Sequence, residues 1–336
     1  YAITLNIFVQ SILFYLFLYL ISNVIFAKKI FKMKLVSVGT VAFDAIETPF
    51  GKTDKIVGGA CTYISLSASY FNSNPKLISV VGDDFPKETI DLLHSKNIDT
   101  EGLQIKEGEK TFFWSGKYHQ DMNSRDTIDT QLNVLETFDP IVPESYYDCD
   151  ILMLGNLTPA VQMNVIKQLP KRPKLIALDT MDFWMQIALD DLLNVIKEID
   201  VLTINDEEAR LLSGDLSLKK AANKILTMGP KYLIIKKGEH GALLFDKNNN
   251  VFSAPALLLE EVFDPTGAGD TFAGGFVSHL SSCDIIDWEA MKKAIIIGSA
   301  MASFTVEKFG IEKLIELDKS QIDERIKEFK NLISFN

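Results

Sequence analysis

The sequence is poor in the side chains that build metal centres and disulfide frameworks. Its three cysteines, Cys61, Cys149 and Cys283, are scattered and form no Cys-x-x-Cys pair, and its four histidines lack metal-ligand spacing. An odd number of cysteines at these spacings offers no disulfide framework either. We therefore expect an intracellular, reduced protein without a zinc site.

Basic charge is also scarce. The net charge is −11 over 336 residues, and the only dense group of lysines lies at residues 28–32. Proteins that bind nucleic acids need a basic surface to neutralise phosphates, so we expect no nucleic-acid partner. A composition of 47% apolar and 24% charged residues is typical of a folded globular protein and not of a disordered one. These values favour an acidic enzyme whose ligand lies in a cleft.

The first 32 residues differ from the rest of the chain. Residues 3–27 are apolar and carry no charge, and a lysine cluster at 28–32 follows them. The chain begins with Tyr1, and Met33 directly precedes a run that resembles a first strand. Three interpretations stay open: an upstream extension that the working protein lacks, a membrane anchor, or a buried helix. A cleavable signal peptide is disfavoured because no positive region precedes the apolar run. In each case we expect residues 33–336 to be cytoplasmic. If the apolar run is a membrane span, the lysines that follow it stay on the cytoplasmic side.

The body of the chain, residues 33–336, alternates short apolar runs with helical patterns. Each run has the length of a strand and is apolar on both faces, which is typical of buried parallel strands. We therefore predict one α/β domain with a doubly wound, mostly parallel sheet flanked by helices. Ligands of such sheets bind at the carboxyl ends of the strands. The apolar runs are Lys34–Val38, Lys76–Val81, Ile151–Leu154, Lys174–Leu178, Val201–Ile204 and Tyr232–Lys237, and helices are expected at Ala60–Phe71, Phe85–Lys96, Thr158–Leu169, Phe183–Ile199 and Leu218–Met228.

Two polar, aromatic-bearing stretches break this alternation, at about residues 41–57 and 102–129. Both are β-like, and we expect them to form a small sheet that projects from the domain as a lid. Ordinary surface hairpins are the alternative interpretation.

A glycine-rich turn precedes a helical pattern late in the chain. Phe272 and Phe276 begin one apolar helical face, so the turn Gly267-Ala268-Gly269 lies at the helix N-terminus. Free backbone N–H groups and the positive end of the helix dipole favour an anion there. Glycine also lets the backbone approach a phosphate closely. The turn therefore predicts a phosphate site.

Asp270 directly follows this turn, although a carboxylate repels phosphate. Its presence is explained if it accepts the proton of a substrate hydroxyl that attacks phosphorus. A carboxylate that only caps the helix is the alternative. Other phosphate motifs do not match, because no Gly-x₄-Gly-Lys-Ser/Thr occurs and Phe272 replaces the third glycine of a dinucleotide fingerprint. We predict phosphoryl transfer with Asp270 as the general base.

The run from Asp264 to Phe276, Asp-Pro-Thr-Gly-Ala-Gly-Asp-Thr-Phe-Ala-Gly-Gly-Phe, resembles the C-terminal motif of the ribokinase-like (PfkB) carbohydrate kinase family. The resemblance covers about residues 33–310 in motif order. It implies a ribokinase fold with a β-sheet lid that often serves in dimerisation. It also implies ATP-dependent phosphorylation of a hydroxymethyl group on a sugar or nucleoside. Within that resemblance, Asp270 matches the base and the Gly267, Ala268 and Gly269 amides match the anion hole.

Further motifs match the nucleotide side of this family. Asn205-Asp206-Glu207-Glu208 resembles its Asn-x-x-Glu pattern, which implies that Glu208 holds Mg²⁺ through water and that Asn205 lies near the phosphates. From the residues alone, the same pattern is a helix N-cap with glutamate at N3. Lys236, Gly238 and Gly241 match the nucleotide loop, although the family often has threonine at position 236. A plain hairpin is the alternative for that loop.

Asp264 and Thr266 match positions near a monovalent-cation site in some members. Use of K⁺ stays open.

On the acceptor side, Asp44 resembles the aspartate that binds substrate hydroxyls, and Gly58-Gly59 resembles the N-terminal glycine pair. Asn156 follows a strand and is expected in the same cleft, with a turn residue as the alternative. Tyr63 stands where many sugar kinases have asparagine, so a simple ribokinase assignment does not follow. Ribose, fructose-type sugars, 2-keto-3-deoxy sugar acids and nucleosides all remain candidate acceptors.

Two other interpretations stay open. The chain could be a catalytically silent sugar- or nucleoside-binding module on this fold, although the presence of Asp270, Glu208 and the glycine turn argues against it. It could also be a membrane-anchored kinase, if residues 1–32 are part of the working protein.

Overall fold

The computed structural model describes residues 33–71 and 74–334. The three interpretations of residues 1–32 therefore lie outside the described residues. In the described ranges, no helix combines the length and the apolar character needed to cross a membrane.

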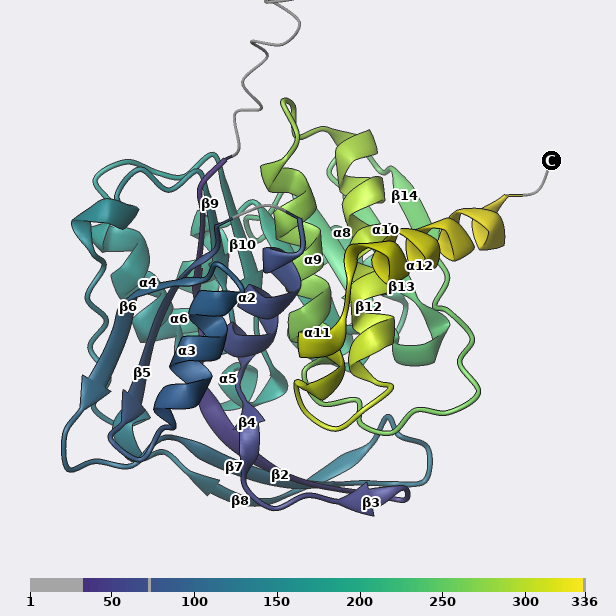
Figure 1. Ribbon diagram of the computed structural model, residues 1–336. Helices are drawn as coiled ribbons and strands as arrows, with labels where there is room; N and C mark the ends of the chain where they lie inside the picture. The colour runs from purple at the N-terminus through teal and green to yellow at the C-terminus, as the bar shows by residue number, and fades with distance from the viewer. Residues whose placement is uncertain (1–32, 72–73, 335–336) are drawn as a thin grey trace, which may run out of the picture. The chain divides into compact units, whose positions relative to one another are not determined.

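A nine-stranded sheet forms the centre of the domain, in the order β14-β13-β12-β11-β10-β9-β1-β5-β6 (Figure 1). Neighbouring strands are parallel from β6 through β12, and β13 and β14 are antiparallel at one edge. The predicted doubly wound sheet is thereby confirmed. Its strands are β1 (Leu35–Val38), β5 (Lys76–Gly82), β6 (Asp99–Lys106), β9 (Ile151–Leu154), β10 (Leu175–Asp179), β11 (Val201–Asn205), β12 (Tyr232–Lys236), β13 (Ala242–Asp246) and β14 (Val251–Ala254).

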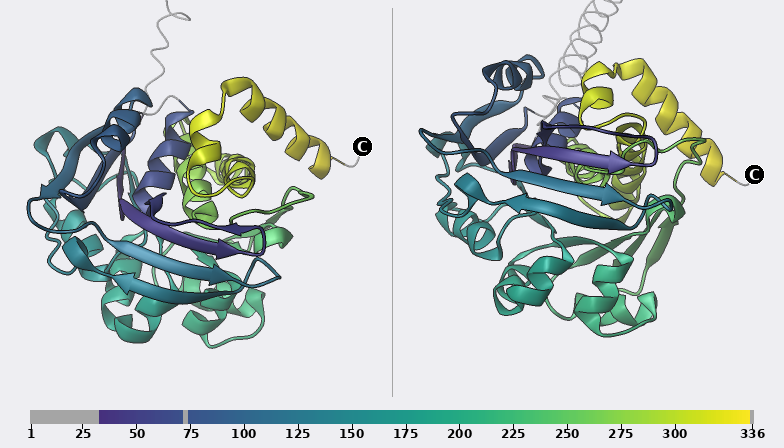
Figure 2. Two further views of the ribbon diagram at one scale, coloured as in Figure 1. Left: turned by 60° about the horizontal axis from the view of Figure 1, so that its bottom comes forward. Right: turned by 90° about the horizontal axis from the view of Figure 1, so that it is seen from below.

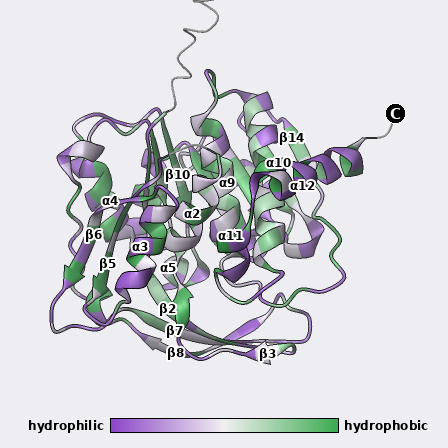
Figure 3. Ribbon diagram, viewed as in Figure 1, coloured by the Kyte–Doolittle hydropathy of each residue, from purple (hydrophilic) through white to green (hydrophobic). Residues whose placement is uncertain are grey.

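Helices cover both faces of this sheet, because alternate residues of each interior strand point to opposite cores. In β9, Leu152 and Leu154 belong to one apolar cluster, whereas Ile151 and Met153 belong to the other. The first cluster includes residues of α4 (Pro159–Gln168), α6 (Leu189–Glu198), α7 (Asp206–Ser213) and α8 (Leu218–Leu226). The second includes residues of α2 (Ala60–Ser69), α9 (Ala268–Ser281), α10 (Trp288–Thr305) and α12 (Lys319–Ile333), and Figure 3 shows α12 as mostly hydrophilic on its outer side.

The remaining helices are short. The expected helix at Phe183–Ile199 is divided into α5 (Asp182–Ile187) and α6, because Ala188 has φ −142° and ψ 38° and leaves the helical conformation. The others are α3 (Lys87–Ser95), α11 (Glu312–Glu316) and three 3₁₀ turns at Asn133–Leu135, Glu144–Tyr146 and Gly238–His240.

A smaller sheet lies across one end of the domain (Figure 2). Its order is β3-β2-β7-β8, with β4 also paired to β2, and its strands are β2 (Ala42–Thr48), β3 (Gly51–Lys52), β4 (Ile56–Gly58), β7 (Phe113–Tyr118) and β8 (Arg125–Gln131). Its second segment begins later than the expected residue 102, because Asp99–Lys106 is the edge strand β6 of the main sheet. An edge strand with one exposed face is as polar as a lid strand, so the sequence pattern did not separate them. Figure 1 shows this sheet below the carboxyl ends of β5 and β6.

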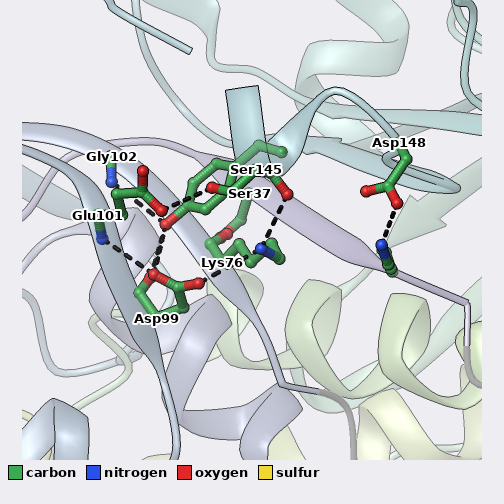
Figure 4. Close-up of polar contacts among 9 residues, drawn as sticks. Ser37, Lys76, Asp99, Glu101, Gly102, Ser145 and Asp148 are labelled. Atoms are coloured by element: carbon green, nitrogen blue, oxygen red, sulfur yellow. Dashed lines mark hydrogen bonds and ion pairs between the residues drawn. The ribbon is translucent and has the colours of Figure 1, made fainter. Parts of the chain in front are cut away.

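A polar cluster fastens β6 at the opposite, amino ends of the strands (Figure 4). The Tyr146 hydroxyl accepts a hydrogen bond from the Gly102 N–H at 3.2 Å and donates to Asp99 Oδ1 at 2.9 Å. Lys76, the first residue of β5, pairs with Asp99 at 3.3 Å and donates to the Ser145 carbonyl at 3.1 Å. This partly buried Lys–Asp pair is structural, because it lies at the end of the sheet away from the glycine-rich turn.

Candidate active site

The glycine-rich turn lies at the N-terminus of α9, as predicted. Gly267 is the N-cap with φ 75° and ψ 0°, a left-handed conformation that favours glycine. A Cβ at this position would lie 2.4 Å from the Tyr63 ring, so both the backbone and the available space require glycine. No side chain caps this helix. Of the three amides expected to bind an anion, that of Ala268 donates to the Pro265 carbonyl at 3.2 Å within the turn.

Asp270 lies in the first turn of α9. Burial and then the nearby Asp179 carboxylate raise its pKa to about 7, although Lys236 and Arg125 act in the opposite direction. A carboxylate with a pKa near neutrality is well suited to accept a proton at physiological pH. Its environment therefore fits the role of a base better than that of a simple helix cap.

An ion pair lies directly beside this turn. Lys236 ends β12, Asp179 ends β10, and Lys236 Nζ lies 2.6 Å from Asp179 Oδ2. A Cβ on Gly269 would lie 3.0 Å from Lys236 Nζ, so the ammonium lies close to the turn. Because the two strands flank β11 in a parallel arrangement, their carboxyl ends meet at the same edge of the sheet.

Asp179 was not among the residues predicted for the site. The available signal was its position, since it is the last residue of a fully buried strand, at the same edge as the other predicted residues. Its side chain is 8% exposed. A buried carboxylate at a strand end in this fold class is a candidate for function even without a motif.

Glu208 combines a capping role with burial. Its Oε2 accepts from the Asn205 N–H at 2.7 Å, and Asn205 Oδ1 accepts from the Glu208 N–H at 2.8 Å, so the capping box is formed. Burial is the main reason that its pKa is raised to about 7, with Asp179 and Asp182 contributing and Lys236 opposing. A cap alone needs no such burial. The helix cap is therefore formed, and a further role of Glu208 at the site stays a prediction.

The donor chemistry of Glu208 suits a hard cation such as Mg²⁺, which prefers carboxylate and water oxygens. Within the described ranges, no group of three His, Cys, Asp or Glu side chains could hold a metal ion. Mg²⁺ is commonly bound by one or two carboxylates together with water and substrate phosphates. The site fits that mode.

On the acceptor side, Asp44 and the glycine pair come together as predicted. The Asp44 carboxylate accepts a hydrogen bond from the Gly59 backbone, and a Cβ on Gly58 would overlap Asp44 Oδ2 at 1.8 Å. Glycine is therefore required for the carboxylate to lie against the chain. Burial, followed by Asp264 and Asp270, raises the pKa of Asp44 to about 7. Asp44 and the candidate base are therefore close enough to interact electrostatically, and their shared role in one site stays a prediction.

Tyr63 occupies the space between these two sides. Its ring lies against Gly267 and is 1% exposed. In the part of the chain that the structure describes, its hydroxyl has no hydrogen-bond partner. Burial and the carboxylates of Asp44, Asp264 and Asp270 all raise its pKa well above the ordinary value, so the hydroxyl stays neutral.

Asp264 and Thr266 hold the turn in place. Asp264 is completely buried, and its two oxygens accept from the Thr266 and Gly310 N–H groups, each at 2.9 Å. The Thr266 hydroxyl donates to the Tyr118 hydroxyl of the smaller sheet at 3.1 Å. These contacts give both residues a structural role, and their predicted role near a monovalent cation stays a prediction.

Asn156 is held by the segment that follows β10. Its Oδ1 accepts from Trp184 Nε1 at 2.8 Å, and its Nδ2 contacts Met181 Sδ at 3.1 Å. The amide is therefore already engaged by α5 and its preceding loop. A role in substrate binding would require these contacts to rearrange, and it stays a prediction.

The smaller sheet reaches both sides of the site. Arg125 of β8 acts electrostatically on Asp270 and also lies over the Trp114 ring, 5.7 Å from its centre. At the tip of the β7–β8 hairpin, Asn123 Oδ1 lies 2.6 Å from the position of a Cβ on Gly238. The tip of this hairpin therefore lies close to Gly238 of the predicted nucleotide loop.

Similar proteins agree with this architecture. A family model described as pfkB family carbohydrate kinase matches residues 32–316. A cytidine kinase from Thermococcus kodakarensis is 29% identical over 282 residues, which cover 83% of this chain and 98% of the relative. The crystal structure of the Methanocaldococcus jannaschii nucleoside kinase superposes with a TM-score of 0.71 at 24% identity and covers 88% of this chain and 99% of its own. A candidate ribokinase II from E. coli, solved with ATP and Mg²⁺, gives a TM-score of 0.70 at 19% identity over 89% and 99% of the two chains.

Proposed function

The chain belongs to the pfkB family of carbohydrate kinases and is a phosphotransferase with an alcohol group as acceptor, and we propose that it transfers the γ-phosphoryl group of ATP to a hydroxymethyl group of a nucleoside. One observation carries this proposal. The partly buried Asp270 carboxylate lies at the glycine turn and interacts electrostatically with Asp44 and Lys236, which we propose on its acceptor and nucleotide sides.

The proposed reaction is an in-line displacement. A lone pair of the acceptor hydroxyl oxygen attacks the γ-phosphorus while the hydroxyl proton passes to the Asp270 carboxylate. The bond between the γ-phosphorus and the bridging oxygen breaks, and its electron pair leaves with ADP. The turn at Gly267–Gly269 and the positive end of α9 stabilise the negative charge on the transferring group.

Glu208 would hold Mg²⁺, which neutralises phosphate charge in such reactions. The E. coli structure with ATP and Mg²⁺ supports this pair of ligands for a fold of this kind. Asn205, Gly238 and Gly241 are the further contacts that we propose on the nucleotide side. The left-handed φ of 81° at Gly241 supports a tight backbone turn beneath the phosphates.

Asp44 is the proposed contact for the acceptor. A carboxylate can accept hydrogen bonds from two neighbouring hydroxyls at once, as the ribose of a nucleoside presents them. The cytidine and nucleoside kinases among the relatives support a nucleoside as the first acceptor to test. A free sugar is the second candidate, supported by the ribokinase relatives.

The smaller sheet is the proposed lid, and its outer strand is a proposed dimer contact. Every residue of β8 is exposed, including Ile128 at 65%. Light scattering of the purified chain tests the dimer.

The decisive experiment measures ADP formation from ATP with a panel of cytidine, uridine, adenosine, inosine, ribose, fructose and 2-keto-3-deoxygluconate. We expect a nucleoside to give the highest kcat/KM, and mass spectrometry to identify its 5′-monophosphate. ADP formation only with a sugar would favour the second candidate. Acceptor binding without any ADP formation would instead favour a silent binding module.

A further inference from the structure

Lys236 is the side chain of the site whose position the family resemblance explains least. Its Nζ lies 2.6 Å from Asp179, and it would lie 3.0 Å from a Cβ on Gly269, in the turn that is proposed to bind the phosphoryl group. The carboxylates of Asp179, Glu208 and Asp270 all raise the pKa of Lys236, against the effect of burial. The ammonium is therefore charged and lies near both Asp179 and the proposed anion site.

Acidic groups outnumber cations at this site. Asp44, Asp179, Glu208 and Asp270 contribute carboxylates, whereas Lys236 and Arg125 contribute the cations that act on Asp270. A triphosphate adds further negative charge and would be repelled by such a surface. A cation held at the anion site, and free to turn toward it, offsets this repulsion.

The exposure of the pair fits such a movement. The Lys236 side chain is 21% exposed, whereas that of Asp179 is 8% exposed, so the ammonium is the more accessible partner. A lysine ammonium on its flexible four-carbon stem can turn from one anionic partner to another that lies within its reach. Buried ion pairs often contribute little net stability, so stability alone does not explain an ion pair at this site.

We propose that Lys236 exchanges Asp179 for the γ-phosphoryl group of bound ATP and is a catalytic residue of the transfer. The inference rests on the proposed kinase function and deepens it. Lys236 remains protonated throughout, so its ammonium forms hydrogen bonds to the phosphoryl oxygens while the proton of the acceptor still passes to Asp270. Its contact strengthens as negative charge develops on the transferring group.

A set of four variants tests this exchange against a purely structural pair. Lys236→Met removes the cation, and Asp179→Asn with Lys236→Met removes both charges. Lys236→Arg keeps the charge with a different geometry. Lys76→Met is the matched control, because Lys76 also forms a partly buried pair with an aspartate, at the far end of the sheet.

We expect Lys236→Met to lower kcat by about 100-fold or more, the usual result of removing one donor from such a site, with the acceptor KM changed by less than about threefold. The double variant should stay as slow, because neutralising Asp179 does not replace the missing contact. Lys236→Arg should recover part of the rate. Recovery of the double variant to within about threefold of wild type would show that Lys236 only neutralises Asp179, and would overturn the proposal. Lys76→Met should lower stability without changing kcat.

Binding provides a readout that does not depend on turnover. Calorimetry at fixed Mg²⁺ compares ADP with the β,γ-methylene analogue of ATP, which carries the γ-phosphoryl group. Lys236→Met should weaken binding of the analogue by about tenfold and binding of ADP by less than about threefold. Equal effects on both nucleotides would refute the contact with the γ-phosphoryl group. Failure of the wild-type chain to transfer phosphate to any acceptor would refute the proposed function, and the binding comparison would still decide the role of Lys236.

Discussion

Replacement of Asp270 by asparagine should separate catalysis from stability. The amide keeps the shape of the side chain but can neither accept the acceptor proton nor carry the negative charge. General-base assistance is typically worth about 10²–10⁴-fold, so turnover should fall by two to four orders of magnitude. Nucleotide binding should persist, because the turn and Lys236 are unchanged.

The same change should stabilise the folded protein at alkaline pH. The pKa of Asp270 is raised from 3.8 to about 7 in the folded state. A group whose folded pKa lies above its unfolded value favours folding at low pH, and this contribution is lost as pH rises from about 4 to about 7. Roughly three pKa units at about 1.4 kcal/mol each give an upper limit of about 4 kcal/mol. Asp270→Asn should therefore unfold less readily than wild type at pH 8, with no such difference at pH 4.

Two assays measure these effects. Release of ADP, coupled to a visible reaction, gives kcat and KM at the pH where wild type is fastest. Urea unfolding at pH 4 and pH 8 gives the free energy of unfolding of both proteins. The wild-type kcat/KM should rise with pH up to about 7, because only the ionised carboxylate accepts a proton. Near-normal turnover in Asp270→Asn would refute the assignment of the base. A variant less stable than wild type at pH 8 would refute the buried-charge explanation of the pKa.

Three further substitutions, one of them with a matched control, test the packing around the site and the edge of the sheet. Gly267→Ala should lower the free energy of unfolding by about 2–4 kcal/mol and remove most of the activity, because its Cβ would meet the Tyr63 ring. Gly108→Ala is the control, since Gly108 has a similar φ of 74° but no described atom within 4 Å of its Cβ position. It should lower the free energy of unfolding by only about 1 kcal/mol in urea. Tyr63→Phe should raise the free energy of unfolding by about 1 kcal/mol, since it removes a buried hydroxyl that has no partner among the described residues; a loss of stability would mean that this hydroxyl is bonded. Tyr146→Phe should lower it by about 1–3 kcal/mol, because the Gly102 N–H loses its partner, and unchanged stability would contradict that bond.

Patterns carried by neighbouring residues predicted much of this protein. Each apolar run was predicted to be a buried strand because its successive side chains are apolar. The strands β1, β9 and β10 are buried at every residue, as their composition indicates. The capping box of Asn205 and Glu208 formed as its spacing indicates. The turn before Asp270 begins α9, because glycine, proline and the following apolar stripe specify that geometry locally.

Contacts between distant segments could not be predicted from the patterns of neighbouring residues. Lys236 and Asp179 are 57 residues apart, and their ion pair depends on β10, β11 and β12 lying side by side in that order. The pairing of β6 with β5, and not with the smaller sheet, likewise depends on strand order.

The sequence by itself thus determined the α/β class and the position of the turn, because both follow from local periodicity and backbone chemistry, and the role of Asp270 as the base stays a prediction. The tertiary structure alone decided that Tyr63 fills the space beneath Gly267 and that an ammonium lies against Gly269. The physical reason is that a parallel sheet brings residues from separate crossovers to one edge, and the order of its strands is fixed by packing of the whole domain.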